Sequence, residues 1–230
     1  MRMASAAAAA AELAAGAAIP ARAAIIIDTS AQTTAYTVPG RNLPASATVA
    51  ANNMSNFSSA EGTSSTLDGL TDGSLGNAGN SGSGAYAAAV AVHNGGVLTH
   101  ILATAMRIDL IETSVAWGDG GRDAQQYTVA YAAASDPATF MDISTVDYNP
   151  DPAPFPANDR VVITSDAGAL ATNVVAWRFS FPATENGYVG YRELEALGSA
   201  VPERASLGLL GLGAQALLRR QRQGPARAMR

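Results

Sequence analysis

The segment RIDLIETSVAWGDGGRDAQQYTVAYAA, from Arg107 to Ala133, decides the fold of this chain. Apolar residues lead into a Gly- and Asp-rich turn at residues 118–121, and Tyr127, Val129 and Tyr131 follow it at every second position. Side chains spaced in this way lie on one face of a β-strand, because successive residues of a strand point to opposite sides. The segment therefore predicts two β-strands joined by a loop.

Other short runs of β-branched, aromatic and alternating residues predict further strands, with turn residues between them. They cover Ala24–Thr29, Ala35–Val38, Tyr86–Val92, Val97–Ala103, Phe140–Tyr148, Arg160–Thr164, Val174–Phe181 and Tyr188–Leu197. Residues 52–84 are instead rich in Ser, Gly, Asn and Thr, which predicts a long loop. Short strands at intervals of roughly ten residues favour an antiparallel β-sandwich or barrel.

The chain has 230 residues, enough for one domain of ordinary size with terminal extensions. It contains no cysteine, which excludes disulfide bonds and thiolate metal sites. The net charge is −5, and the 14 cationic residues, all arginine, form no basic run before the last segment. Because a protein that binds nucleic acid needs a basic face to neutralise phosphates, we expect no nucleic-acid partner.

Residues 1–23 have the features of an export signal. Arg2 supplies a positive charge, an Ala-rich run follows, and Ala21-Arg22-Ala23 fits the small-x-small cleavage pattern. Glu12 interrupts the apolar run. The pattern predicts a signal-peptide-like leader and export, and the alternative is an Ala-rich leader that is helical or disordered.

The C-terminal residues 201–222 combine three features in a fixed order. Val201, Pro202 and Glu203 precede an apolar segment of fourteen residues, Ala205–Leu218, and Arg219 and Arg220 follow it. This order resembles the bacterial PEP-CTERM sorting signal, although Arg204 stands where that signal has a second proline. The resemblance implies membrane anchoring through the C-terminus, processing by an exosortase-type membrane protease, and a location at the cell surface or in the extracellular matrix.

An alternative reading of this segment stays open. Fourteen apolar residues are short for a membrane-spanning helix, which needs about 20. The segment would then be an amphipathic terminal helix packed on the domain. Residues 223–230 form a short basic tail in either case.

Residues 24–200 resemble a discoidin-like domain, which is a galactose-binding-like jelly roll. The resemblance rests on Leu67-Asp68-Gly69, Trp117–Tyr131, Thr145–Pro150 and Gly187–Gly198. It implies two packed sheets, often a structural Ca²⁺, and frequently sugar binding by loops at one end. The expected fold is thus all-β, an antiparallel jelly-roll β-sandwich, between a signal-like N-terminal segment and a C-terminal apolar helix.

The resemblance assigns a calcium site to Asp68 and Glu193, with Asp72 as a second carboxylate and Glu195 as an alternative to Glu193. Ca²⁺ prefers oxygen ligands from carboxylates and backbone carbonyls, which a Gly-rich acidic loop facing a carboxylate supplies. Glu193 and Glu195 are two residues apart in a predicted strand and share a face. Alternatively, Asp68 and Asp72 only form Asx turns with the glycines that follow them.

Sugar-binding sites combine aromatic faces with polar side chains, because sugar rings present C–H faces and arrays of hydroxyl groups. The candidates here are Trp117, Asp119, Arg122 and Asp123 in and beside one predicted loop, and His93 and Asn94 in another. Other readings stay open for each: Arg122 could pair with Asp119 or Asp123, Trp117 could be core, and His93 could be a surface turn residue. Trp177, Phe179 and Phe181 alternate and are expected in the core.

Catalytic motifs are missing from the sequence. It has no Gly-x-Ser-x-Gly and no His-Glu-x-x-His, and only two histidines, His93 and His100. We therefore expect no enzyme. The predicted function is an exported, surface-sorted carbohydrate-binding module whose partner is an extracellular polysaccharide. The alternative is a structural or adhesive matrix protein with no small ligand.

Overall fold

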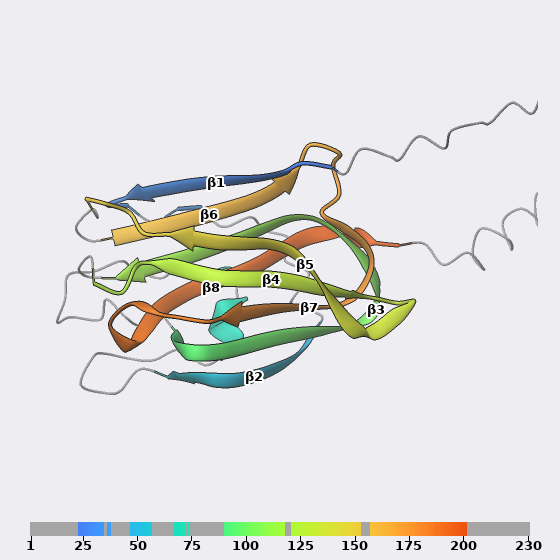
Figure 1. Ribbon diagram of the computed structural model, residues 1–230, viewed down its shortest axis with the longest axis horizontal. Helices are drawn as coiled ribbons and strands as arrows, with labels where there is room; N and C mark the ends of the chain where they lie inside the picture. The colour runs from blue at the N-terminus through green and yellow to red at the C-terminus, as the bar shows by residue number, and fades with distance from the viewer. Residues whose placement is uncertain are drawn as a thin grey trace, which may run out of the picture.

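The computed structural model describes residues 23–34, 36–37, 47–56, 67–71, 73, 90–117, 121–152 and 157–201. Within these residues the chain forms β-strands and two short 3₁₀ helices (Figure 1). In order they are β1 (Ile25–Gln32), β2 (Ala47–Asn56), η2 (Leu67–Leu70), β3 (Val90–Trp117), β4 (Gln125–Ala133), β5 (Asp136–Tyr148), β6 (Ala157–Ser165), β7 (Ala171–Phe181), η3 (Glu185–Gly187) and β8 (Tyr188–Ala200). The prediction of an all-β fold is confirmed.

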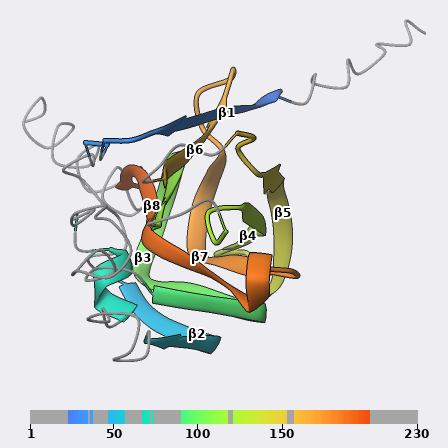
Figure 2. The same ribbon diagram turned by 90° about the vertical axis from the view of Figure 1, so that its left-hand side faces the viewer.

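The 28-residue strand β3 takes part in both layers of the fold. Its first part, Val90–Leu102, pairs with β2, and Gly96–Ile108 pair with β7. Its last part, Ile111–Trp117, pairs with β6, and β8 pairs with Met106–Val115 and also with Val90–His93 at the start of the strand. The path β1-β6-β3-β7-β4-β5 therefore curls around a common interior, with β2 and β8 attached to β3 (Figure 2). One layer contains β2, β7, β4 and β5, the other contains β1, β6 and β8, and β3 connects them. This curled sheet is consistent with a jelly-roll sandwich.

Six of the seven pairings between the described strands are antiparallel, as predicted. The exception is β8, which runs parallel to β3. The two strands approach so closely that a Cβ at Gly198 would overlap the backbone carbonyl oxygen of Arg107. Only glycine fits at this point of β8 without displacing β3.

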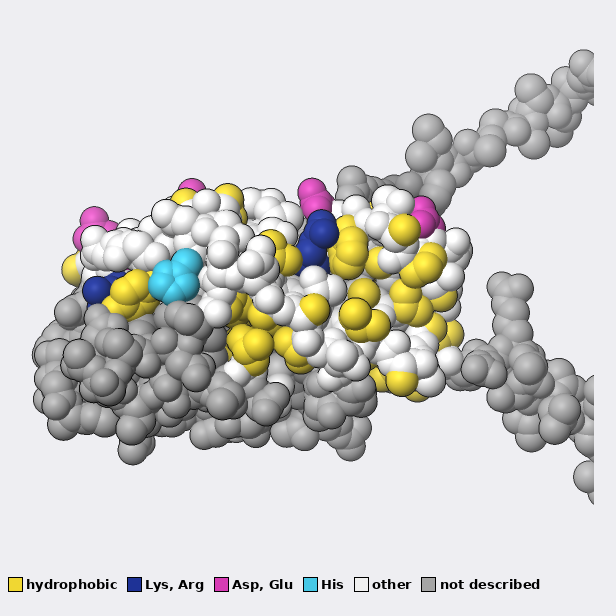
Figure 3. All heavy atoms as spheres, turned by 90° about the horizontal axis from the view of Figure 1, so that it is seen from below, with side chains coloured by type: hydrophobic (Ala, Val, Ile, Leu, Met, Phe, Trp, Pro, Cys, Tyr) yellow, Lys and Arg dark blue, Asp and Glu magenta, His cyan; other side chains and the backbone are white. Residues whose placement is uncertain are grey.

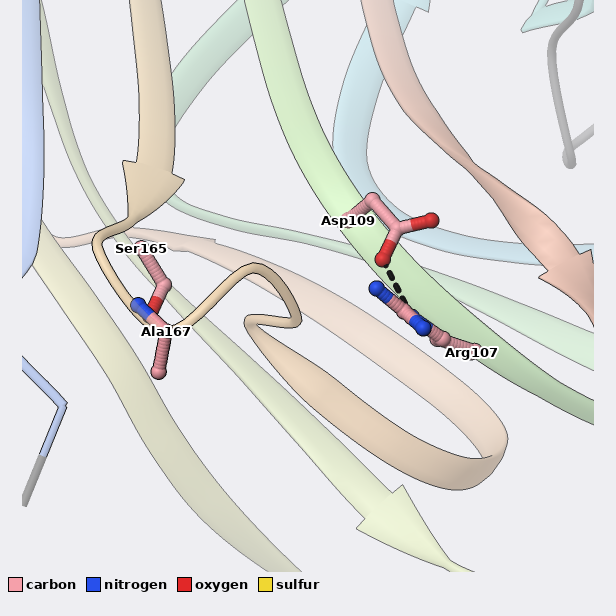
Figure 4. A network of polar contacts seen from close by, with 4 residues as sticks. All are labelled: Arg107, Asp109, Ser165 and Ala167. Atoms are coloured by element: carbon pink, nitrogen blue, oxygen red, sulfur yellow. Dashed lines mark hydrogen bonds and ion pairs between the residues drawn. The ribbon is translucent and has the colours of Figure 1, made fainter.

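The turn after β6 packs beside the bend of β3 (Figure 4). In this turn the Ala167 N–H donates to Ser165 Oγ at 3.3 Å, and on β3 Arg107 Nε donates to Asp109 Oδ1 at 2.5 Å. Both members of that ion pair are exposed, so its contribution to stability is small. The Leu170 N–H also donates to the Ile108 carbonyl at 2.9 Å, which ties the start of β7 to β3.

The prediction was wrong for three parts of the chain. His93 and Asn94, expected in a loop, lie within β3, where the register of the pairing with β2 is irregular. The other two parts lie earlier in the chain. Residues 47–56, of which 52–56 were expected to lie in the long loop, form β2. Residues 36–37 are not in a strand, although one was expected at Ala35–Val38. β2 is rich in Ala and Asn, which have a low propensity for β-strands, and it is stabilised by its pairing with β3. Asn53, at a φ of 52°, marks the irregular register within it.

The core lies between the two layers. Trp177, Phe179 and Phe181 are all at most 1% exposed, which confirms their predicted core position. The ring of Tyr127 lies 5.5 Å from that of Phe179, and the ring of Tyr191 lies 5.1 Å from that of Phe181. Packed aromatic rings of this kind bring together residues from β4, β7 and β8.

His100 is fully buried in this core, and its ring stacks on Trp177 at 4.7 Å. Burial lowers the pKa of His100 to about 4. The folded state therefore holds fewer protons than the unfolded state between the usual pKa of 6.5 and about 4. The stability that depends on neutral His100 is complete above pH 6.5 and is lost as the pH falls through the folded-state pKa of about 4.

We expect the melting temperature of the wild type to fall more steeply below pH 6.5 than that of His100→Phe, which keeps a ring but cannot be protonated. Scanning calorimetry of both proteins across this range measures the difference. Equal slopes would show that His100 is protonated without cost and is not sealed in the core.

Among the described residues, no helix is long and apolar enough to cross a membrane. Of the leader only Ala23 is described, and of the sorting motif only Val201, whose N–H donates to the Ala105 carbonyl at 3.1 Å. Pro202, Glu203, Arg219, Arg220 and the predicted C-terminal helix lie outside the described residues.

Candidate functional site

Both ends of β3 meet the start of β8, because the strand bends through the whole domain. In the pairing with β8, His93 lies opposite Tyr188, and Val115 lies opposite Tyr191. This end of the sandwich is at the left in Figure 1. The bend thus brings His93 and Trp117, which lie near opposite ends of one strand, to the same side chain, Tyr188.

Three of the predicted ligand-binding residues, His93, Trp117 and Arg122, form one cluster with Tyr188. The Arg122 guanidinium carbon lies 4.0 Å from the centre of the Tyr188 ring and 5.2 Å from that of Trp117. The His93 ring lies 5.7 Å from that of Tyr188. We call these four residues the Arg122 cluster. A guanidinium over aromatic faces is stabilised by the ring quadrupoles and is held in a defined position.

The members of the cluster differ in exposure. Trp117 is 2% exposed and meets Tyr188 edge-on at 6.0 Å, so it forms the floor of the cluster. His93, Arg122 and Tyr188 are half-buried. Trp117 is thus buried, as the alternative prediction expected for a core residue. Its ring nevertheless lies against the Arg122 guanidinium. A ligand would meet the three half-buried side chains first.

Asn94, which is exposed beside the cluster, holds a neighbouring loop. Its Oδ1 accepts hydrogen bonds from the backbone N–H of Thr184 at 2.7 Å and from the Thr184 hydroxyl at 2.8 Å. The amide oxygen is thus engaged within the protein, and its amide nitrogen is the atom with which Asn94 could reach a ligand.

The turn that carries Arg122 is tied to η3 and β8. Asn186 Nδ2 donates to the Gly121 carbonyl at 2.6 Å, and the Gly190 N–H donates to the Arg122 carbonyl at 3.5 Å. Glu185 Oε2 accepts from the backbone N–H groups of Asp123 at 3.2 Å and of the next residue at 3.3 Å. These bonds fix the backbone on both sides of Arg122.

Asp123 points into the protein and is fully buried, so it is not placed to contact a ligand at the surface. Its neighbour in the interior is Asp159 of β6, also fully buried. Burial raises the pKa of both Asp123 and Asp159, and the charge of Asp123 contributes to the shift of Asp159. Asp119, the remaining predicted member of the loop, lies outside the described residues.

The predicted calcium ligands are only partly described. Glu193 and Glu195 are buried in β8, and η2, which contains Asp68, packs against this strand. Burial raises the pKa of Glu195 to about 7, with a further contribution from Glu112. The Asp68 side chain and Asp72 lie outside the described residues. Within the described part of the chain, no three His, Cys, Asp or Glu side chains form a group that could hold a metal ion.

A hollow lies on the outer face of the layer formed by β3, β7, β4 and β5, away from the Arg122 cluster. Its volume is about 450 Å³, and it is lined by Thr99, Ile101, Leu102, Ala134, Pro137, Phe140, Val175 and Ala176. Hydrophobic side chains gather on the right-hand half of the face shown in Figure 3. The lining carries one hydroxyl and no charge, so it offers few partners for the hydroxyl groups of a sugar.

Sequence analysis missed Tyr188, Glu185 and Asp159 as parts of this region. Tyr188 lies in the stretch Gly187–Gly198, whose residue pattern predicts a strand but no ligand contact. The signal for Asp159 was available, because an acidic residue two positions before Val161 takes an inward-facing place in a strand. The sequence carries no comparable signal for Tyr188, because only the bend of β3 brings His93 and Trp117 close to this residue.

No protein-family model and no curated protein matches this sequence. Solved structures with a similar fold include the CBM32-1, CBM32-2 and M60 catalytic domains of Clostridium perfringens ZmpB, at 15% identity and a TM-score of 0.45. They also include CpGH89CBM32-5 of C. perfringens in complex with GalNAc-β-1,3-galactose, at 11% and 0.44. A third is the family 32 carbohydrate-binding module of Streptococcus pneumoniae EndoD, at 14% and 0.44.

The similar regions cover 66%, 68% and 71% of this chain, respectively, and 14%, 98% and 99% of the three solved chains. This chain therefore spans a small part of the first and nearly all of the other two. Identities and TM-scores of this size do not identify a ligand for this chain.

Proposed function

We propose that this chain is a non-enzymatic carbohydrate-binding module that binds polysaccharide through the Arg122 cluster. One observation carries the proposal: the Arg122 guanidinium is held 4.0 Å from the centre of the half-buried Tyr188 ring, and the His93 ring lies 5.7 Å from the same ring. Guanidinium and imidazole groups supply hydrogen-bond donors for hydroxyl groups, and the aromatic edge supplies an apolar surface for C–H faces. A polar group fixed in advance loses little conformational entropy on binding.

The chain offers a matched control for this proposal. Arg178 lies over the Phe140 ring at 4.1 Å, so it forms the same kind of contact on the outer face of a different part of the domain. We expect Arg122→Ala to bind a soluble polysaccharide roughly 10- to 100-fold more weakly, as when a charged hydrogen bond is lost. We expect Arg178→Ala to bind like the wild type.

Affinity electrophoresis in gels that contain soluble polysaccharides measures this effect. Retardation of the wild type and of Arg178→Ala, but not of Arg122→Ala, supports the proposed site. If both variants are retarded equally, the ligand binds elsewhere. If the wild type migrates unchanged across neutral and acidic polysaccharides, the proposed function is wrong.

A structural or adhesive role is the second candidate, and the edge strand β1 favours it. Within the described residues β1 pairs only with β6, and Ile25, Ile26 and Ile27 are 37%, 43% and 40% exposed. An edge strand with exposed apolar side chains is a surface on which another chain can add a strand. Sedimentation at increasing concentration tests this role: a chain that stays monomeric and binds polysaccharide argues against it.

We also propose that the chain is exported through residues 1–23 and sorted to the cell surface through residues 201–222. The support lies in the sequence patterns of these two segments. Expression in a bacterium that carries an exosortase, followed by N-terminal sequencing of the surface fraction, tests both. A mature chain that begins at Met1 and stays in the cytoplasm would contradict the proposal.

A structural Ca²⁺ fits the type of donor present beside β8. Glu193 is buried, and the Asp-Gly turn η2 packs against its strand. We propose that Glu193 and Asp68 would hold the ion, with Asp72 and Glu195 as further carboxylates, and that it would fix η2 to the sheet. We expect Ca²⁺ to raise the melting temperature relative to a chelator, and Glu193→Gln to remove this difference. Equal melting temperatures of the wild type would exclude the site.

A further inference from the structure

Two carboxyl groups lie together in the interior of the sandwich, beneath the turn that carries Arg122. Asp159 lies on the inward face of β6 with Val161 and Ile163, and all three are fully buried. Asp123 reaches it from the turn between β3 and β4. None of the four carboxyl oxygens accepts a hydrogen bond from a donor within the described residues. Two carboxylates in this position would be unsatisfied and would repel each other.

The titratable groups around Asp123 and Asp159 are either negatively charged or neutral, so none of them offsets the charge of the two carboxyl groups. Glu185 of η3 raises the pKa of both carboxyls, after the larger effect of burial. The phenols of Tyr148 and Tyr36 feel the charge of Asp159 and are neutral near pH 7, since burial raises their pKa values. The nearest arginines in the sequence bind elsewhere: Arg160 pairs with Glu112 at 2.8 Å, and Arg122 lies over Tyr188.

One proton resolves this conflict. A protonated Asp159 donates its O–H to the Asp123 carboxylate, so that two of the four oxygens are satisfied and a single negative charge remains. Asp159 is the better place for the proton, because it lies within the sheet between β1 and β3 and cannot reach water. When the proton leaves to solvent, two like charges face each other in a medium of low dielectric constant.

The movable member of the pair is Asp123, which lies in a turn rather than in a strand. Its neighbour in the chain is Arg122, whose carbonyl accepts from Gly190 at 3.5 Å, a long bond. Repulsion that drives the Asp123 carboxyl outward must therefore pull on the backbone of Arg122. It would also strain the bonds that Glu185 Oε2 accepts from the N–H groups of Asp123 and Ala124, just before β4.

We propose that Asp123 and Asp159 share one proton, and that this proton holds the Arg122 turn in its ligand-binding position, so that binding weakens when the pair becomes fully ionised. The effect on binding rests on the proposed function of the Arg122 cluster. The effect on the turn does not. Asp123 and Asp159 are thus positioning residues, which act on the ligand through Arg122.

The direction of the pH dependence follows from the raised pKa values. The folded state holds the shared proton at pH values where the unfolded chain has already lost it. The stabilisation is complete below the ordinary carboxyl pKa of 3.8 and is lost as the pH rises through the raised pKa at which the pair gives up its shared proton. Alkaline conditions, rather than acidic ones, are therefore expected to loosen this turn.

The test compares the wild type with Asp159→Asn, whose amide can donate to Asp123 at every pH. Asp142→Asn, which removes an exposed carboxyl group from β5, is the matched control. With a chelator present, melting temperatures and the amide-exchange protection of Asp123 and Ala124 are measured between about pH 5 and pH 9. We expect both to fall with pH in the wild type and in Asp142→Asn. In Asp159→Asn we expect the amide protection to stay level and the melting temperature to fall less, by the part due to Glu195, whose raised pKa is unchanged. Parallel profiles in all three proteins would overturn the proposal.

Two further measurements complete the test. Infrared difference spectra of wild type minus Asp159→Asn at neutral pH should show the C=O stretch of a protonated carboxyl group, and its absence would overturn the shared proton even if the variant folds poorly. Polysaccharide binding should weaken at least 3-fold toward high pH only in proteins that keep Asp159. Binding that is independent of pH, with the exchange effect present, would overturn the link to the ligand.

Failure of the proposed function has a different signature. A wild type that binds no polysaccharide at any pH would refute carbohydrate binding and, with it, control of binding by the proton. The exchange profile would still decide whether the proton holds the turn. If Ca²⁺ alone restores the melting temperature at high pH in the wild type but not in Asp159→Asn, the pair holds a cation, and the shared proton is wrong.

Discussion

Replacement of Gly198 by alanine is expected to destabilise the domain by about 3 kcal/mol or more, the upper part of the range for overpacked sites. The new Cβ would overlap the Arg107 carbonyl oxygen and would lie 2.8 Å from the Arg107 carbonyl carbon and 3.1 Å from Ile108 Cα. These atoms are backbone and cannot rotate away. β3 cannot retreat without breaking its pairing with β6 or β7. The melting temperature should fall by roughly 6–12 °C.

A second glycine separates this effect from the general cost of adding a methyl group. Gly73 has a positive φ of 76°, and no atom of the described part of the chain lies within 4 Å of its would-be Cβ. Alanine at this position should cost only about 1 kcal/mol, from backbone strain. If Gly198→Ala is no less stable than Gly73→Ala in thermal unfolding, β8 does not approach β3 as closely as described.

Replacement of Trp177 by alanine is expected to cost about 3–5 kcal/mol, because it leaves a large cavity between the layers. Trp177 is completely buried and stacks on His100. Loss of the ring would remove contacts from both β3 and β7 and leave the His100 ring without its stacking partner. Unfolding in urea, followed by circular dichroism, measures the loss.

Trp177→Phe is the matched control, since it keeps a ring in the same place and should cost less than the alanine variant. The chain contains two tryptophans. The fluorescence of Trp177→Ala therefore reports Trp117 alone, so the same sample shows whether the Arg122 cluster stays intact while the core is weakened. A cost below about 1.5 kcal/mol would place Trp177 outside the core.

The fold could be predicted where alternation and apolar residues agree. Trp177, Phe179 and Phe181 alternate, and the pattern indicated their strand and its buried face. β2 could not be predicted, because its Ala and Asn residues carry little strand propensity and its partner is distant in the sequence. The parallel pairing of β8 could not be predicted either, since it depends on how β3 bends.

The candidate site shows the same division. Arg122, Trp117 and His93 were selected by residue type and by their positions beside turns, and the structure brings them together. Asp123 was selected on the same grounds, but the backbone at this point turns its carboxyl inward to Asp159. Local sequence shows which side chains could do the chemistry. Whether they face water or the interior depends on contacts with residues far away in the chain.

The continuity of β3 through both layers has a mechanical consequence. Both layers contain part of the same continuous strand, β3. We therefore expect that neither layer can unfold while the other keeps its hydrogen bonds. A pulling force applied at Ala24 and Ala200 would load β1 and β8, which flank β6 and the second half of β3. Single-molecule extension should therefore show one unfolding event for the whole domain rather than a series of partial unfolding steps.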